Sequence, residues 1–156
     1  MRRSERTFVS YIDKSRDYYA AQGYEQPYEW ASDDRAPFTP LAKPLSEVRV
    51  GIVTTAALDE EQKLQQYFAP TTPTPESVVT EHLSWHKGAT HTNDLGSYLP
   101  IDHLRTLVDE GVVGSLAPRF AGAPTLYSQR LTARHAAVIA DGFAEDGVDL
   151  ALLVPL

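Results

Sequence analysis

The densest group of side chains suited to chemistry lies within 13 positions of the chain: His82, His86, His91, Asn93 and Asp94. One interpretation is a metal site formed by His82, His86 and His91, with Asp94 as an alternative third ligand. A second is polar substrate binding or proton transfer by His86, His91 or Asp94. A third is a solvated loop with ordinary histidines. No HExxH motif supports the metal interpretation.

A second candidate group is the pair Thr54 and Thr55, which directly follows a β-branched segment, residues 48–53. Its hydroxyls and backbone N–H groups can bind an anionic ligand, and a plain ST-turn explains the pair equally well.

Residues 111–114 lack the third glycine of a dinucleotide fingerprint and precede a strand, so they do not indicate NAD binding. The chain has no GxSxG or Walker A motif, so serine-hydrolase and P-loop chemistry lack their signatures.

The elements that must position these residues follow from hydrophobic periodicity and from proline and glycine. The pattern predicts a first helix over residues 5–22 and a proline-rich aromatic arm over 24–46. Strands are predicted at 48–53, 77–83, 112–116 and 148–154, and helices at 58–68, 100–111 and 124–140. The residues expected to face inward on these three helices are Leu58, Leu64, Tyr67, Phe68, Ile101, Leu104, Leu107, Val108, Leu131, Val138 and Ile139.

Strands that alternate with helices predict an α/β fold. We expect three layers around a mostly parallel, doubly wound (Rossmann/flavodoxin-like) sheet of about four strands. The last strand is nearly all apolar, which predicts burial on both faces. The organisation is an N-terminal helix and arm over residues 1–43 and an α/β domain over 44–156. Ligands of such sheets bind beyond the carboxyl ends of the strands. We therefore predict that the residues lining a substrate site are Thr54, Thr55, His86, His91 and Asp94.

Composition excludes several classes of protein. The 156 residues carry 14 Lys and Arg against 21 Asp and Glu, a net charge of −7, which argues against a nucleic-acid footprint. The longest apolar run, residues 150–154, is far shorter than the roughly 20 residues of a membrane helix. There is no cysteine and no secretory signal at the start, so a cytoplasmic location is the default expectation.

Three segments resemble one enzyme family. They are residues 94–114 (DLGSYLPIDHLRTLVDEGVVG), residues 44–56 (PLSEVRVGIVTTA) and residues 148–155 (VDLALLVP). The chain resembles, over roughly residues 44–156, the family of glycine/sarcosine/betaine reductase component B and the D-proline reductase selenoprotein subunit. It departs from that pattern at Gly96, where the family has an asparagine.

The resemblance implies reductive cleavage of a C–N or C–S bond in a small amine or amino-acid-like substrate. In that family the last of these strands leads directly to a redox-active selenocysteine or cysteine, a position that would follow Leu156. We therefore expect the gene to continue through a UGA codon meant as selenocysteine. The alternatives are a naturally short paralogue and a subunit completed by another chain. These 156 residues alone are expected to contain no catalytic residue and to be inactive.

The expected partners are further copies of the chain or other reductase subunits, with no nucleic acid and no membrane. Two competing functions stay open. The aromatic N-terminal helix and arm suit a non-catalytic binding or assembly subunit. The loop from His82 to His91 suits a metal-binding protein.

Overall fold

The computed structural model describes residues 11–24, 26, 34, 39–81, 91–126 and 128–156. The chain divides into two compact units, Met1–Pro37 and Phe38–Leu156. In the first unit, helix α1 spans Tyr11–Ala21 and ends before Gly23, whose φ of 86° favours glycine. Tyr18, on α1, is 60% exposed within this unit. Phe8 of the predicted first helix and Tyr28 and Trp30 of the predicted aromatic arm lie outside the described residues.

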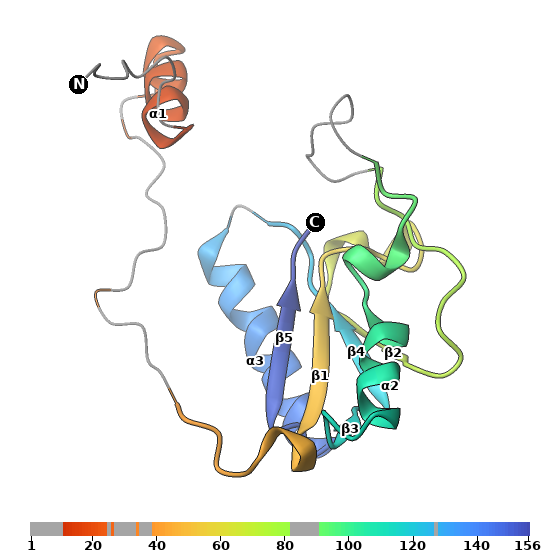
Figure 1. The fold of residues 1–156 in the computed structure, drawn as a ribbon. Helices are drawn as coiled ribbons and strands as arrows, with labels where there is room; N and C mark the ends of the chain where they lie inside the picture. The colour runs from red at the N-terminus through yellow and green to blue at the C-terminus, as the bar shows by residue number, and fades with distance from the viewer. Residues whose placement is uncertain (1–10, 25, 27–33, 35–38, 82–90, 127) are drawn as a thin grey trace, which may run out of the picture. The chain divides into compact units, whose positions relative to one another are not determined.

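The second unit is a five-stranded, mostly parallel sheet (Figure 1). The central strand β1 (Arg49–Thr54) pairs in parallel with β5 (Leu150–Val154) along one edge. Along the other edge it pairs in parallel first with β3 (Ser115–Leu116) and then with β4 (Arg119–Gly122). Strand β2 (Tyr67–Pro70) is antiparallel to β4. The α/β fold and the mostly parallel sheet are as predicted.

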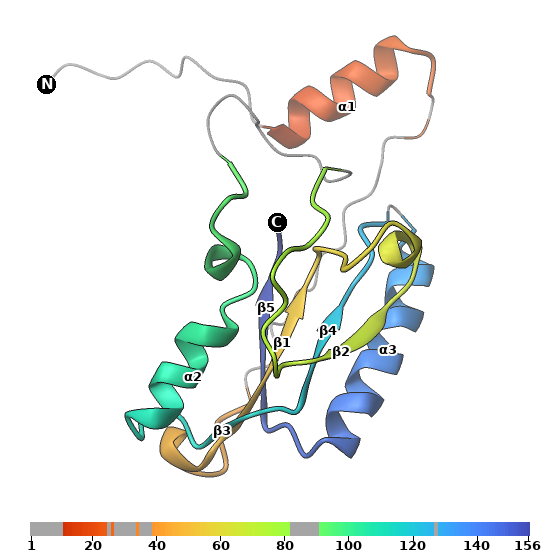
Figure 2. The same ribbon diagram turned by 90° about the vertical axis from the view of Figure 1, so that its right-hand side faces the viewer.

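Helices α2 (Ile101–Asp109) and α3 (Gln129–Glu145) cover opposite faces of this sheet (Figure 2). The described part of this unit also contains three 3₁₀ turns, at Leu45–Glu47, Glu61–Leu64 and Leu95–Ser97. No helix among the described residues is long and apolar enough to cross a membrane.

Each face of the sheet has its own core. On the α2 face the fully buried residues are Val48, Ile52, Leu99, Ile101 and Phe120, with other apolar side chains around them. On the α3 face Ile139 and Phe143 pack on Ala121. A Cβ at Gly51 would lie 2.9 Å from the Phe143 ring, so the glycine lets α3 pack closely against β1.

Helix α2 forms where its local signals predict it. Pro100 precedes the first turn, where its missing N–H costs nothing, and Gly111 ends the helix with a φ of 72°. The predicted inward face is correct: Ile101 and Leu104 are buried, and Leu107 and Val108 pack at the edge of the same core.

The helix predicted over residues 58–68 is wrong. A 3₁₀ turn occupies Glu61–Leu64, Leu64 is 76% exposed, and the chain then enters β2. The physical reason lies in Tyr67 and Phe68. In a strand these neighbours point to opposite faces, so Tyr67 joins the α2-side core and Phe68 the α3-side core. Two adjacent apolar residues therefore serve two layers, which one helical face cannot do.

The strand predicted over residues 77–83 is also absent from its described part, residues 77–81. Val79 forms a single antiparallel bridge with Ala57 and no further ladder. Both edges of β1 are already occupied by other strands, so this segment has no place beside it.

The later boundaries shift as well. Val112 and Val113 precede β3, and Pro118, which has no N–H to donate, separates β3 from β4. The helix expected from Pro124 begins instead at Gln129, after Ser128, whose Oγ accepts the N–H of Leu131 at 3.4 Å. The helix continues to Glu145.

Two burial predictions also fail. Val138 on α3 is 45% exposed rather than inward-facing. Strand β5 was expected to be buried on both faces, yet Leu153 is 69% exposed and Leu150 and Leu152 are also exposed. Among the described residues β5 pairs with β1 alone, so it is an edge strand and has half the neighbours of a central one.

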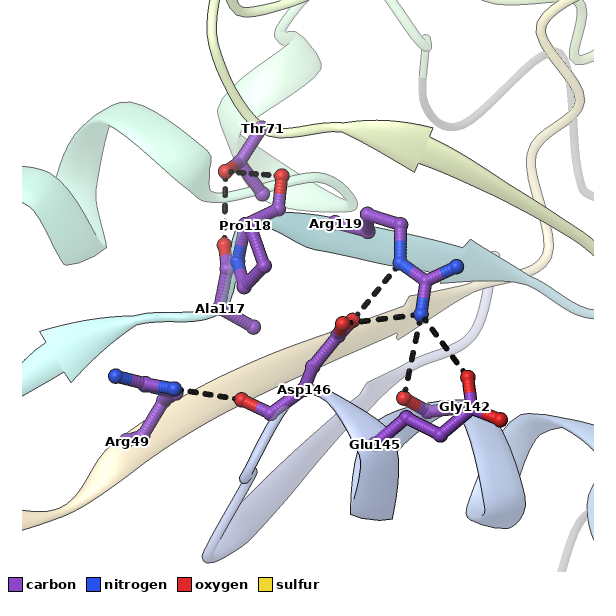
Figure 3. A network of polar contacts seen from close by, with 8 residues as sticks. All are labelled: Arg49, Thr71, Ala117, Pro118, Arg119, Gly142, Glu145 and Asp146. Carbon is purple, nitrogen blue, oxygen red and sulfur yellow. Dashed lines mark hydrogen bonds and ion pairs between the residues drawn. The ribbon is translucent and has the colours of Figure 1, made fainter.

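A polar network joins α3 to the amino ends of the strands (Figure 3). The Arg119 guanidinium on β4 donates to both carboxylate oxygens of Asp146, at 2.9 and 3.0 Å. Arg49 on β1 donates to the Asp146 carbonyl at 2.6 Å. The pairing with Asp146 raises the pKa of Arg119. Asp146, the first residue after α3, thus ties the parallel strands β1 and β4 to the end of this helix.

Gly122→Ala tests the packing of β2 on β4. The added Cβ would lie 1.8 Å from the Tyr67 ring, which is buried and whose hydroxyl donates to the Ala56 carbonyl at 2.7 Å. Because the ring is held, the free energy of unfolding should fall by about 1–3 kcal/mol in urea denaturation. Gly96→Ala is the control, since its clash is with the exposed His103 side chain, which can rotate away. Equal stability of the two variants would contradict this packing.

Asp149→Asn tests the ion pairs before β5. Asp149 accepts the Arg49 backbone N–H at 2.8 Å and the Lys43 ammonium at 2.7 Å, and these contacts lower its pKa from the usual 3.8. A carboxyl group whose pKa is lower in the folded state stabilises the fold at pH values above its unfolded-state pKa. This stabilisation is lost as the pH falls through its folded-state pKa. On acidification below about pH 4, the melting temperature of the variant should therefore fall less than that of the wild type. Asp141→Asn, at an exposed position of α3, is the control. The melting temperature of this variant should depend on pH as that of the wild type does.

Candidate functional site

The carboxyl ends of β1, β4 and β5 meet at one edge of the sheet. Thr54 pairs with Gly122 on one side and with Val154 on the other. The arrowheads of β1 and β5 point to the same edge in Figure 1. Below that edge, a cavity of about 480 Å³ lies between the strands and α3. This is the position at which an open parallel sheet ordinarily binds ligands.

Small side chains create this cavity. Its lining residues are Val53, Thr54, Thr55, Ala123, Pro124, Thr132, His135, Ala136, Ile139, Ala140, Phe143, Ala151, Leu153, Val154 and Pro155. Ala136 and Ala140 on α3, with Ala123 and Ala151 on the sheet side, leave unfilled the space that larger residues occupy around Phe143. Among the described residues that line it, none carries a formal charge.

Thr54, a predicted site residue, borders the cavity with its side chain fully buried. Its Oγ1 accepts the N–H of Ala56 at 3.3 Å, which is the geometry of an ST-turn. Its carbonyl accepts the N–H of Ala123 at 2.8 Å. The hydroxyl and the carbonyl of Thr54 therefore hold the backbone around the cavity.

Thr55, the second predicted residue, joins the ends of β1 and β5. The N–H of Leu156 donates to the Thr55 Oγ1 at 2.9 Å, and the Leu156 carbonyl lies 3.5 Å from the same oxygen. These residues are 101 positions apart in the chain. Thr55 therefore fixes the course of the backbone as it leaves β5 along the rim of the cavity.

His135, which was not predicted, is the histidine among the described residues that line the cavity. It is half-buried on α3, and its Nδ1 contacts the Oε1 of Gln66. The available signal was the helical spacing of Thr132, His135 and Ile139, which places the three on one face of α3.

His91 and Asp94 do not line this cavity. Asp94 is exposed and caps the 3₁₀ turn Leu95–Ser97, with its Oδ1 accepting the Gly96 N–H at 3.0 Å. The exposed His91 accepts the Asn93 N–H at Nδ1, at 3.3 Å. This segment leads into α2, on the face of the sheet opposite α3. The structure thus separates the predicted site residues into two groups.

The segment around Asp94 also affects Tyr98, a core residue. The Tyr98 hydroxyl donates to the Thr92 carbonyl at 2.9 Å. Burial and then the nearby Asp94 carboxylate raise the pKa of Tyr98. The contacts of Asp94 and Tyr98 therefore stabilise the turn that precedes α2.

The metal site predicted at His82, His86 and His91 falls mostly outside the described residues, which include His91 alone of the three. Within the described part of the chain, no group of three or more His, Asp or Glu side chains is arranged to hold a metal ion. The substrate-site prediction for His86 likewise lies outside the described residues.

Comparison with known proteins gives no assignment: no family model, curated protein or solved structure matches the chain.

Thr55→Val tests the tie between β1 and β5. Valine has a similar shape but cannot accept the Leu156 N–H, so amide hydrogen exchange in residues 150–156 should become about five- to tenfold faster, as expected for one lost hydrogen bond. Thr55→Ser keeps the hydroxyl and should keep the wild-type exchange rates. Equal rates in the valine and serine variants would show that the tie does not hold the end of β5.

Proposed function

We propose that this chain is a subunit, or the N-terminal part, of a cytoplasmic reductase similar to the glycine, betaine and D-proline reductases. Its reaction would be the reductive cleavage of a C–N or C–S bond in a small amine or amino-acid-like substrate. The observation that supports this most is the course of β5. Thr55 holds the backbone of Leu156 beside the end of β1, at the rim of an apolar cavity. A residue that follows Leu156 would begin at this rim.

The chemistry of that position supports the proposal. A selenolate or thiolate there would supply the nucleophile that attacks carbon or sulfur. The chain's own residues would perform the remaining tasks. Thr55 would position the backbone that carries the nucleophile, and the apolar lining would contact the apolar part of the substrate. A dithiol would supply the electrons.

The segments that carry the family resemblance have separate structural roles. Residues 44–56 and 148–155 contain β1 and β5, the two strands that lead to the cavity. Residues 94–114 contain the Asp94 cap, α2 and the Gly111 turn, which form the opposite face of the sheet. At Gly96 the His103 Nε2 lies 2.7 Å from the position of a Cβ, so an asparagine there would require the imidazole to move.

A second candidate is a non-catalytic assembly subunit. The observation that favours it is the exposure of three leucines, Leu150, Leu152 and Leu153, along the edge strand β5. Such a subunit would associate with further copies of the chain or with other subunits. Light scattering after size-exclusion chromatography separates the two candidates, because a clean monomer would argue against the assembly function.

The reductase proposal is tested first in the DNA. Sequencing past codon 156 should show a UGA codon that is followed by an open frame. An ordinary stop codon with no open frame beyond it would count against the proposal, unless a co-purifying second chain carries the redox residue.

The second test is turnover. The purified 156-residue chain should not reduce glycine betaine or D-proline with dithiothreitol, because it contains no cysteine. A chain extended by the downstream frame, with cysteine at the UGA position, is expected to regain measurable turnover of an amine substrate, and its serine counterpart is the matched control. Turnover by the 156-residue chain alone would refute the assignment of the nucleophile.

A further inference from the structure

We draw no further inference here: the strongest candidate, the apolar cavity between α3 and the carboxyl end of β5 together with the exposed edge of that strand, carries none, because nothing in the described part of the structure shows what occupies the cavity or covers the strand.

Discussion

The pairing of β1 on both of its edges is the constraint on which the rest of this unit depends. Parallel partners on either side place Thr54, Gly122 and Val154 at one level of the sheet. The three strands therefore end side by side, and their carboxyl ends form the rim of the cavity. The close approach of Phe143 at Gly51 then sets how near α3 lies to the sheet, and the alanines further toward the edge leave the space unfilled.

The sequence predictions are correct where an element is determined by local interactions and wrong where it depends on contacts with distant segments. Helix α2 was predicted correctly because its signals are local: Pro100 before it, a buried stripe along it and Gly111 after it. Strand β2 was missed because Tyr67 and Phe68 divide between two cores that are built by distant segments. Strand β4 (Arg119–Gly122) likewise has no counterpart among the predicted strands, since its pairing depends on β1 and β2.

The candidate site divides in the same way. Thr54 and Thr55 were predicted from a general rule about the edges of parallel sheets, and they do border the cavity. His91 and Asp94 were predicted from the same rule, as residues that follow a strand at 77–83. The described part of that segment forms only one bridge, and the contacts of His91 and Asp94 are those of a local turn and cap. His135 was missed because a single histidine on an amphipathic helix looks the same in sequence whether it faces solvent, a core or a cavity.

Residues 150–156, which include strand β5, contain no charged side chain, and the outer edge of β5 offers backbone groups and leucine side chains. Such a segment is of the kind that recruits other strands, including unwanted ones. Two residues limit this tendency. Asp149 places a carboxylate, held by Lys43 and the Arg49 backbone, directly before the strand. Pro155 follows it and has no N–H to extend a ladder. A carboxylate and a proline thus flank the exposed strand β5, the kind of gatekeeper residues that limit aggregation of apolar strands.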